Sequence, residues 1–251
     1  MNSRRKFIRN TALSTGAALV STNSIAAARQ EKTAEGKLKI LVAGAHPDDP
    51  ETGMGGTISK YTSQGHEVIC LYLTSGEVGI PGTNHEQAAA IRKKEALEAC
   101  KIMNTRPVFF GQIDGSCEVN SGWYDKMIQL VKQENPDMIF THWPIDSHRD
   151  HRICAEIVFD AWSKTGKRAS LYYYEVMTGS QTQNFQPDSF VDITRFAETK
   201  WKACMVHKSQ KVEEFYPESH AKMEVFRGLE AGSKYGEAFV HHTQSPLGYL
   251  P

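Results

Sequence analysis

Apolar runs and amphipathic stretches alternate along residues 37–177, and this alternation predicts strands and helices in turn. Short apolar runs that stop at glycine or polar residues are typical of buried strands, whereas apolar positions three or four residues apart are typical of helices. The predicted strands are Lys37–Ala43, His66–Thr74, Pro107–Gly111, Asp137–His142 and Ser170–Met177. The predicted helices are Gly55–Gln64, Glu86–Asn104, Trp123–Glu134 and Asp150–Thr165, and the second presents Ala89, Ile91, Ala96, Leu97 and Cys100 on one helical period.

The residues after Met177 are less regular, with a short strand predicted at Phe190–Ile193 and helices at Phe196–His207 and Pro217–Glu230. Strands that alternate with helices form a mostly parallel sheet with helices on both faces. We therefore expect a single α/β domain, Rossmann-like and doubly wound, over residues 37–251. In the common strand order 3-2-1-4-5, ligands bind beyond the carboxyl ends of strands one and four, where the order reverses.

Two clusters of chemically active side chains follow these two strands. His46-Pro47-Asp48-Asp49 comes directly after the first strand, and His148-Arg149-Asp150-His151 comes shortly after the fourth. The clusters are about a hundred residues apart in sequence, yet the predicted topology brings them to the same edge of the sheet. Imidazole and carboxylate groups are the usual ligands of a catalytic zinc, which takes three protein ligands and keeps one position for water.

We predict that His46, Asp49 and His151 bind the metal. Asp48 is then left beside the bound water as the general base. His148 would stabilise the developing oxyanion or protonate the leaving amine. The two aspartates of the first cluster thereby receive different roles, one holding the metal and the other moving a proton.

Each cluster also has an interpretation without a metal. Pro47–Asp49 is compatible with a turn that caps the following helix, and Asp150 with the N-cap of the helix that begins beside it. In the metal interpretation Asp150 instead hydrogen-bonds to a histidine and tunes its basicity. A nucleotide site is excluded, because Gly53-Met54-Gly55-Gly56 gives neither G-x-G-x-x-G nor a P-loop, and the preceding turn is acidic.

His46-Pro47-Asp48-Asp49 together with His148-x-Asp150-His151 resembles the PIG-L/LmbE-like family of zinc-dependent N-deacetylases, which remove acetyl from N-acetylglucosaminyl groups. The resemblance covers roughly residues 40–155 and implies the same ligands, base and acid as the residues themselves indicate. Supporting segments are Thr74-Ser75-Gly76-Glu77, Arg92-Lys93-Lys94-Glu95, Phe110-Gly111-Gln112-Ile113-Asp114-Gly115 and Phe140-Thr141-His142-Trp143-Pro144, with a weaker similarity at Tyr235-Gly236-Glu237-Ala238-Phe239.

By the same resemblance Arg92 and Asp114 become candidates for binding sugar hydroxyls. An Arg92–Glu95 ion pair on the helix surface is the alternative for the arginine. This chain places Glu51 one residue later than many relatives place a glutamate after the second aspartate, so Glu51 receives no role.

The first residues are typical of an export signal. Ser3–Arg9 contains Arg4-Arg5, Thr11–Val20 is apolar and rich in small residues, and Ala26–Ala28 fits a cleavage site. We expect residues 1–28 to be a twin-arginine (Tat) signal peptide and residues 29–36 a polar linker. An uncleaved anchor is the alternative, but the apolar run is shorter than the roughly 20 residues that cross a bilayer. The Tat export machinery would then be a partner, the mature protein would be periplasmic or secreted, and no stable membrane anchor is expected.

The overall composition narrows the partners further. The 29 basic and 29 acidic residues balance, which gives no electrostatic reason to expect nucleic acid. The five cysteines lack a C-x-x-C pair and lie in apolar patterns, so buried free thiols are expected rather than a disulfide framework or thiolate ligands. A small N-acetylated sugar or glycoconjugate is the expected partner.

The expected function is hydrolysis of the acetamide of an N-acetylglucosamine-type sugar by metal-activated water, with Asp48 as base. Two alternatives remain, a metal-dependent amidase acting on a different N-acyl conjugate and a non-catalytic protein that binds metal or sugar. Zinc is preferred from the ligand types, although such a set also accepts iron, cobalt or manganese.

Overall fold

Five adjacent strands of the sheet are parallel, as the sequence predicts. The computed structural model describes residues 36–251, so the predicted signal peptide and nearly all of the predicted linker lie outside the described residues. The parallel strands are β1 (Lys39–Gly44), β2 (Glu67–Tyr72), β3 (Arg106–Phe109), β4 (Met138–His142) and β5 (Ser170–Tyr174). Their order is β3-β2-β1-β4-β5, which confirms the expected switch point between β1 and β4.

Two more strands extend the sheet beyond β5. They are β6 (Ser189–Asp192) and β7 (Gly236–His241). β7 pairs antiparallel with both β5 and β6, giving seven strands in the order β3-β2-β1-β4-β5-β7-β6. The sequence pattern predicted β6 but not β7. The α/β class with a mostly parallel sheet is confirmed.

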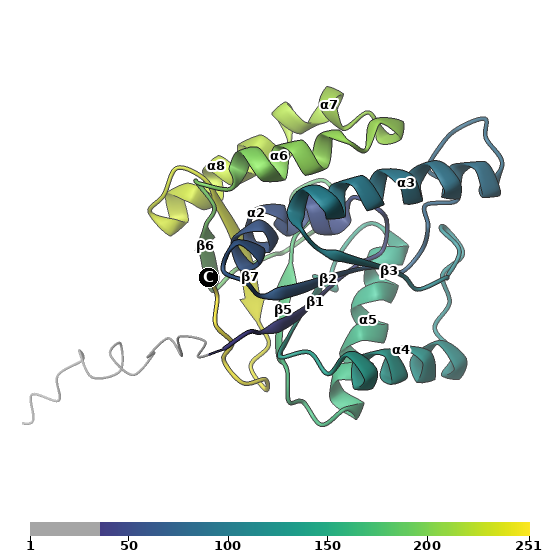
Figure 1. The fold of residues 1–251 in the computed structure, drawn as a ribbon, viewed down its shortest axis with the longest axis horizontal. Helices are drawn as coiled ribbons and strands as arrows, with labels where there is room; N and C mark the ends of the chain where they lie inside the picture. Colours follow the sequence, from purple (N-terminus) through teal and green to yellow (C-terminus); the bar gives the residue numbers. More distant parts are fainter. Residues whose placement is uncertain (1–35) are drawn as a thin grey trace, which may run out of the picture. The chain divides into compact units, whose positions relative to one another are not determined.

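Helices cover both faces of the sheet (Figure 1). One face carries α2 (Asp49–Ser63), α3 (His85–Met103) and α6 (Ala197–Met205), and the other carries α4 (Ser121–Glu134) and α5 (Arg149–Lys164). The remaining helices are α7 (Val212–Phe215), α8 (His220–Ala231) and the short 3-10 helices η1 (Lys208–Gln210) and η2 (Tyr216–Glu218). Alternate residues of β1 enter two separate apolar cores, with Ile40 and Val42 on the α2 face and Leu41 and Ala43 on the α5 face.

Helix α2 begins six residues earlier than predicted because its glycines serve packing. A Cβ on Gly53 would come within 2.5 Å of the Tyr174 ring, and one on Gly56 within 2.7 Å of Ile193. The helix is kinked between them, at Met54, which has φ −149° and ψ 27°. The glycine-rich start therefore lies close to the sheet, which a sequence search for helical spacing does not detect.

The second segment of α2 is capped from β7. The Glu237 carboxylate accepts hydrogen bonds from the backbone N–H of Gly56 (3.0 Å) and Thr57 (2.7 Å). The same carboxylate is 2.7 Å from the buried Lys200 ammonium, which is also 3.1 Å from Glu224. The similarity noted at Tyr235–Phe239 thus has a structural role, because its glutamate holds the kinked helix against the sheet.

The apolar face predicted for α3 is wrong at two positions. Ile91 and Leu97 are exposed, and the buried face carries Ala88, Arg92 and Ala96 instead. An arginine takes the buried position because its guanidinium reaches a carboxylate near the end of β1, and the small alanines allow the helix to approach.

The cysteine prediction is confirmed, since all five thiols are free and buried. Among residues 36–251, no helix is both long and apolar enough to span a bilayer.

Replacing Glu237 with alanine should destabilise the protein strongly, because the variant loses the cap of α2 and leaves Lys200 buried with one carboxylate fewer. We expect the free energy of unfolding to fall by about 3–5 kcal/mol in denaturant titrations. Glu198→Ala, which removes the exposed partner of Lys202 on α6, is the control and should leave the unfolding midpoint nearly unchanged. Equal midpoints for the two variants would contradict the capping role.

Candidate metal centre

The loop after β1 carries a strained residue at the predicted base. Asp48 has φ 127°, a conformation that side-chain-bearing residues rarely adopt, and it occupies the N-cap position of α2 without making a side-chain capping bond. Its carboxylate is 2.8 Å from the Arg92 guanidinium, which also donates to the Pro47 carbonyl. A simple helix cap therefore does not account for the side chain of Asp48.

The carboxylate of Asp49 joins the two sequence clusters. Its Oδ2 accepts from the His46 backbone N–H at 2.7 Å and lies 3.3 Å from Nδ1 of the same histidine. Its Oδ1 lies 3.4 Å from Nε2 of His151, on α5. The three residues predicted to bind a metal are thus brought together, beyond the carboxyl ends of β1 and β4.

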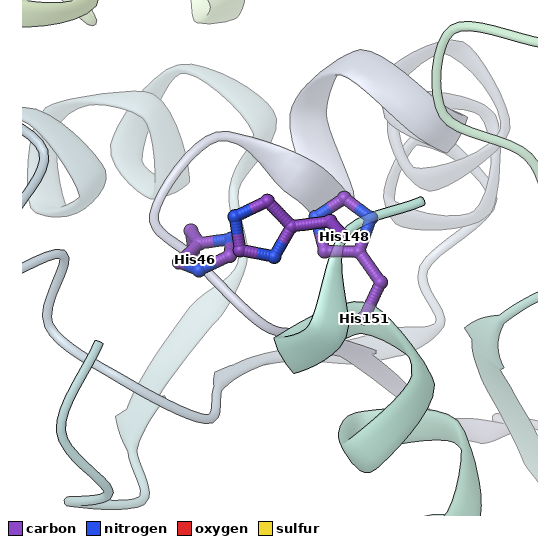
Figure 2. A group of neighbouring side chains, drawn as sticks. All are labelled: His46, His148 and His151. Atoms are coloured by element: carbon purple, nitrogen blue, oxygen red, sulfur yellow. The ribbon is translucent and has the colours of Figure 1, made fainter. Parts of the chain in front are cut away.

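The rings of His46, His148 and His151 form a triangle, and Figure 2 shows the three side chains gathered together. The ring centroid of His148 is 4.6 Å from that of His46 and 4.7 Å from that of His151. His148, rather than Asp150, is the N-cap of α5, and its Nδ1 accepts from the Asp150 backbone N–H at 3.3 Å. The N-cap interpretation of Asp150 is therefore wrong.

Three further carboxylates surround the histidines. Nε2 of His46 is 3.2 Å from Asp114 and 3.5 Å from Asp150, so the histidine that Asp150 contacts is His46. Nδ1 of His151 is 3.3 Å from Asp146. Asp114, predicted to bind sugar hydroxyls, has its carboxylate against the ring of His46.

Asp146 was not among the predicted residues. It lies two positions before His148, and its carboxylate accepts from the His148 backbone N–H at 2.7 Å as well as from the Thr182 hydroxyl at 2.9 Å. The signal that could have identified it is its position in the same acidic and histidine-rich loop. His142 at the end of β4 also belongs to the cluster, because its Nε2 is 3.2 Å from Asp49.

The electrostatics of the cluster favour positive charge at its centre. Burial by itself would lower the pKa of His46, but the neighbouring carboxylates, Asp114 first, outweigh it and raise the pKa well above its ordinary value. Burial likewise opposes the charge on His151, yet Asp49 above all raises its pKa to about 9. Burial would raise the pKa of Asp49, but His151 and His142 hold it well below the usual range.

The donor atoms fit a metal ion. Nε2 of His46 and Nδ1 of His151 lie close to carboxylates without satisfying hydrogen-bond geometry, and Oδ1 of Asp150 is buried without a partner. Three overlapping sets of donors lie within 4.8 Å of one another among the described residues: His46, His148 and His151; Asp49, His142 and His151; and His46, Asp114 and Asp150. A divalent cation satisfies the same need for positive charge that the raised imidazole pKa values express.

Arg92 is buried and belongs to the site. The predicted alternative of a surface pair with Glu95 is wrong, because the Glu95 carboxylate instead accepts from the backbone N–H and hydroxyl of Ser209 at 2.8 and 2.6 Å. Burial raises the pKa of Asp48, and the Arg92 charge opposes that shift. Glu51, left without a role, is fully buried and accepts from the Tyr72 hydroxyl at 2.6 Å.

A cavity of about 370 Å³ opens onto the cluster. His46, Asp48, Arg92 and His148 line its floor, and the segments 176–181 and 210–220 supply its outer walls. The predicted base, the predicted acid and the candidate metal donors therefore face one space, of a size that admits a sugar ring.

Comparison with known proteins identifies the family of this domain. Residues 41–162 match the model of the PIG-L family, described as GlcNAc-PI de-N-acetylase. The chain carries a PIG-L domain. The predicted metal ligands, base and acid all lie inside the matched segment, whereas the outer walls of the cavity lie after it.

Relatives of the PIG-L domain include two curated proteins that match most of the chain. Diacetylchitobiose deacetylase of Thermococcus kodakarensis is 27% identical over 221 residues, covering 79% of this chain and 81% of that protein. A Bacillus cereus protein named probable N-acetyl-alpha-D-glucosaminyl L-malate deacetylase 2 is 29% identical over 195 residues, covering 73% and 88%. Among solved structures, N,N'-diacetylchitobiose deacetylase from Pyrococcus horikoshii has a TM-score of 0.73 at 26% identity, covering 83% of this chain and 87% of that one.

Replacing Asp146 with asparagine should weaken metal binding by the PIG-L domain, because His151 loses the carboxylate that orients its ring. Affinity for zinc should fall by about 10- to 100-fold in a chelator competition titration. Asp125→Asn on the exposed surface of α4 is the matched control and should bind metal as the parent does. Parental affinity in Asp146→Asn would show that Asp146 does not support the ligand.

Proposed function

We propose that this protein is a zinc-dependent N-deacetylase that hydrolyses the acetamide of an N-acetylglucosamine-type sugar or glycoconjugate. The observation that carries the proposal is the meeting of Asp49, His46 and His151 beside the strained, arginine-paired Asp48 in one cavity. The family match and the deacetylase relatives support the acetamide as the bond that is cleaved.

The metal would be held by His46, Asp49 and His151. When bound, zinc supplies Lewis acidity toward the carbonyl oxygen and toward water. Asp114 and Asp150 flank the ring of His46, and Asp146 flanks that of His151, so both imidazoles are oriented by carboxylates.

Asp48 acts as the general base and takes a proton from the attacking water. Burial, which raises the pKa of this carboxyl group, makes it a stronger base than an exposed aspartate, while the Arg92 charge keeps it ionised near neutral pH. The guanidinium also donates to the Pro47 carbonyl, which fixes the loop that carries the base.

His148 faces the carbonyl oxygen or the leaving nitrogen. Because its Nδ1 accepts from the Asp150 backbone N–H, a neutral ring carries its proton on Nε2. Burial, followed by the charges of His46 and His151, lowers the pKa of His148 and so favours the neutral ring, whose Nε2–H donates a hydrogen bond to the developing oxyanion. The proton that Asp48 takes from water passes to the leaving nitrogen, and the products are acetate and the free amine.

The proposal includes export, because residues 1–28 have the sequence pattern of a Tat signal peptide. A Tat substrate crosses the membrane folded, which suits a protein that acquires its metal before export. The protein would then act on glycan or cell-envelope fragments outside the cytoplasm.

Release of acetate tests this function directly. The full-length, zinc-loaded protein should release acetate from N-acetylglucosamine or N,N'-diacetylchitobiose, and a chelator should abolish the release until zinc is restored. Activity only on substrates with longer acyl groups would favour the amidase alternative. Sugar binding without any release would favour a non-catalytic protein, against which the presence of a base and an acid argues.

Replacing Asp48 with alanine should preserve the metal and abolish most turnover. General-base assistance is worth about 10²- to 10⁴-fold, so kcat/KM should fall by that factor while the zinc content stays at one ion per chain. Metal analysis and acetate release on the same preparation provide the measurement. An unchanged rate in zinc-replete Asp48→Ala would exclude the assigned role.

A further inference from the structure

A second groove adjoins the catalytic cavity, and Met177 lines both. The segment 176–181 lines the cavity on one side and residues 215–220 line it on the other. Beyond them lies a groove of about 430 Å³, lined by residues 177–180 and by side chains of η2 and α8. Because Met177 borders both spaces, the groove lies next to the cavity that holds Asp48. We call this space the distal groove.

The walls of the distal groove are fixed to each other by a buried ion pair. Glu175, just before the first wall, binds the Arg227 guanidinium of α8 at 2.6 and 2.8 Å. Thr178, in that wall, donates its hydroxyl to the same carboxylate. The wall is also joined to the metal centre, because the Thr182 hydroxyl donates to Asp146 and bonds the Val176 backbone. These contacts therefore fix the position of the distal groove relative to the catalytic residues.

The lining of the distal groove suits a neutral ring with one apolar face. Met177 and Met223 contribute apolar surface, and Phe226 leaves 52% of its area exposed. The Arg227 guanidinium lies 5.2 Å from the Phe226 ring centroid, which helps to hold this aromatic side chain in place. Hydroxyl groups of Thr178 and Ser180 stand on the opposite wall.

The charges of the distal groove argue against an anionic ligand. Lys222 is the cation that lines it, and its ammonium already pairs with Glu218, which lines the same groove. No cation without a carboxylate partner is left among the described lining residues to receive a malate or phosphate group. A sugar ring, which offers an apolar face for an aromatic side chain and hydroxyls for hydrogen bonds, matches what remains.

We propose that the distal groove binds a second, neutral sugar ring joined to the ring whose acetamide lies at Asp48, so that an N-acetylated disaccharide is preferred over the monosaccharide. This inference rests on the proposed deacetylase function. Phe226, Met177 and Ser180 are its specificity-determining residues. All three lie after residue 162, where the match to the family model ends.

Substrate preference tests the proposal. The zinc-loaded, full-length protein should show a higher kcat/KM for N,N'-diacetylchitobiose than for N-acetylglucosamine. Phe226→Ala should lower the ratio of the two values by about tenfold through loss of aromatic contact. Ser180→Trp, which fills the groove from the opposite wall, should lower it at least as far. Leu229→Ala, which truncates a more exposed apolar side chain of the same helix outside the groove, should leave the ratio unchanged.

A binding measurement separates this proposal from the deacetylase function. Calorimetric titration of zinc-loaded Asp48→Ala with each sugar should give tighter binding of the disaccharide, and adding Phe226→Ala should remove that advantage. Equal affinities for both sugars would overturn the proposed role of the distal groove. A kcat/KM ratio that stays at the parental value in Phe226→Ala and Ser180→Trp would overturn it as well. Disaccharide binding that depends on Phe226, in a protein that releases no acetate, would uphold the groove and reject the deacetylase function.

Discussion

The carboxylate of Asp49 connects the two halves of the catalytic edge. It contacts His46 after β1, His142 at the end of β4 and His151 on α5, within about 3.4 Å in each case. The three histidines lie on either side of the point where the strand order reverses. The short side chain of Asp49 spans the gap between them. The carboxylates around the histidines favour a positive charge at this same point. The topology of the sheet therefore determines both the geometry and the electrostatics of the site.

The central sheet was predictable because each of its strands is a short apolar run with polar ends. β7 was not, because the regular alternation of strands and helices ends after β5, and its glutamate looks like a surface residue until α2 is packed against it. The apolar side chains of Ile91 and Leu97 predict the wrong face of α3 for a related reason. Apolar spacing does not reveal that a buried arginine has a carboxylate to reach.

The candidate ligands were predictable because their residue types are unusual at strand ends and occur in two matching clusters. The surrounding carboxylates were harder. Asp150 was predicted to tune a histidine that the sequence does not identify. The folded chain shows that this histidine is His46. Asp146 was missed because its position in the loop before His148 does not by itself show that its carboxylate reaches His151. The outer walls could not be predicted at all, since their residues meet through irregular segments far apart in the sequence.

The cap that β7 provides has a consequence for the order of assembly during synthesis. Asp49 lies in the first turn of α2, and the later segment of that helix is anchored by Glu237, 188 positions further along the chain. During synthesis every candidate metal donor is therefore made well before this anchor, and the helix that carries Asp49 is capped only once β7 has joined the sheet.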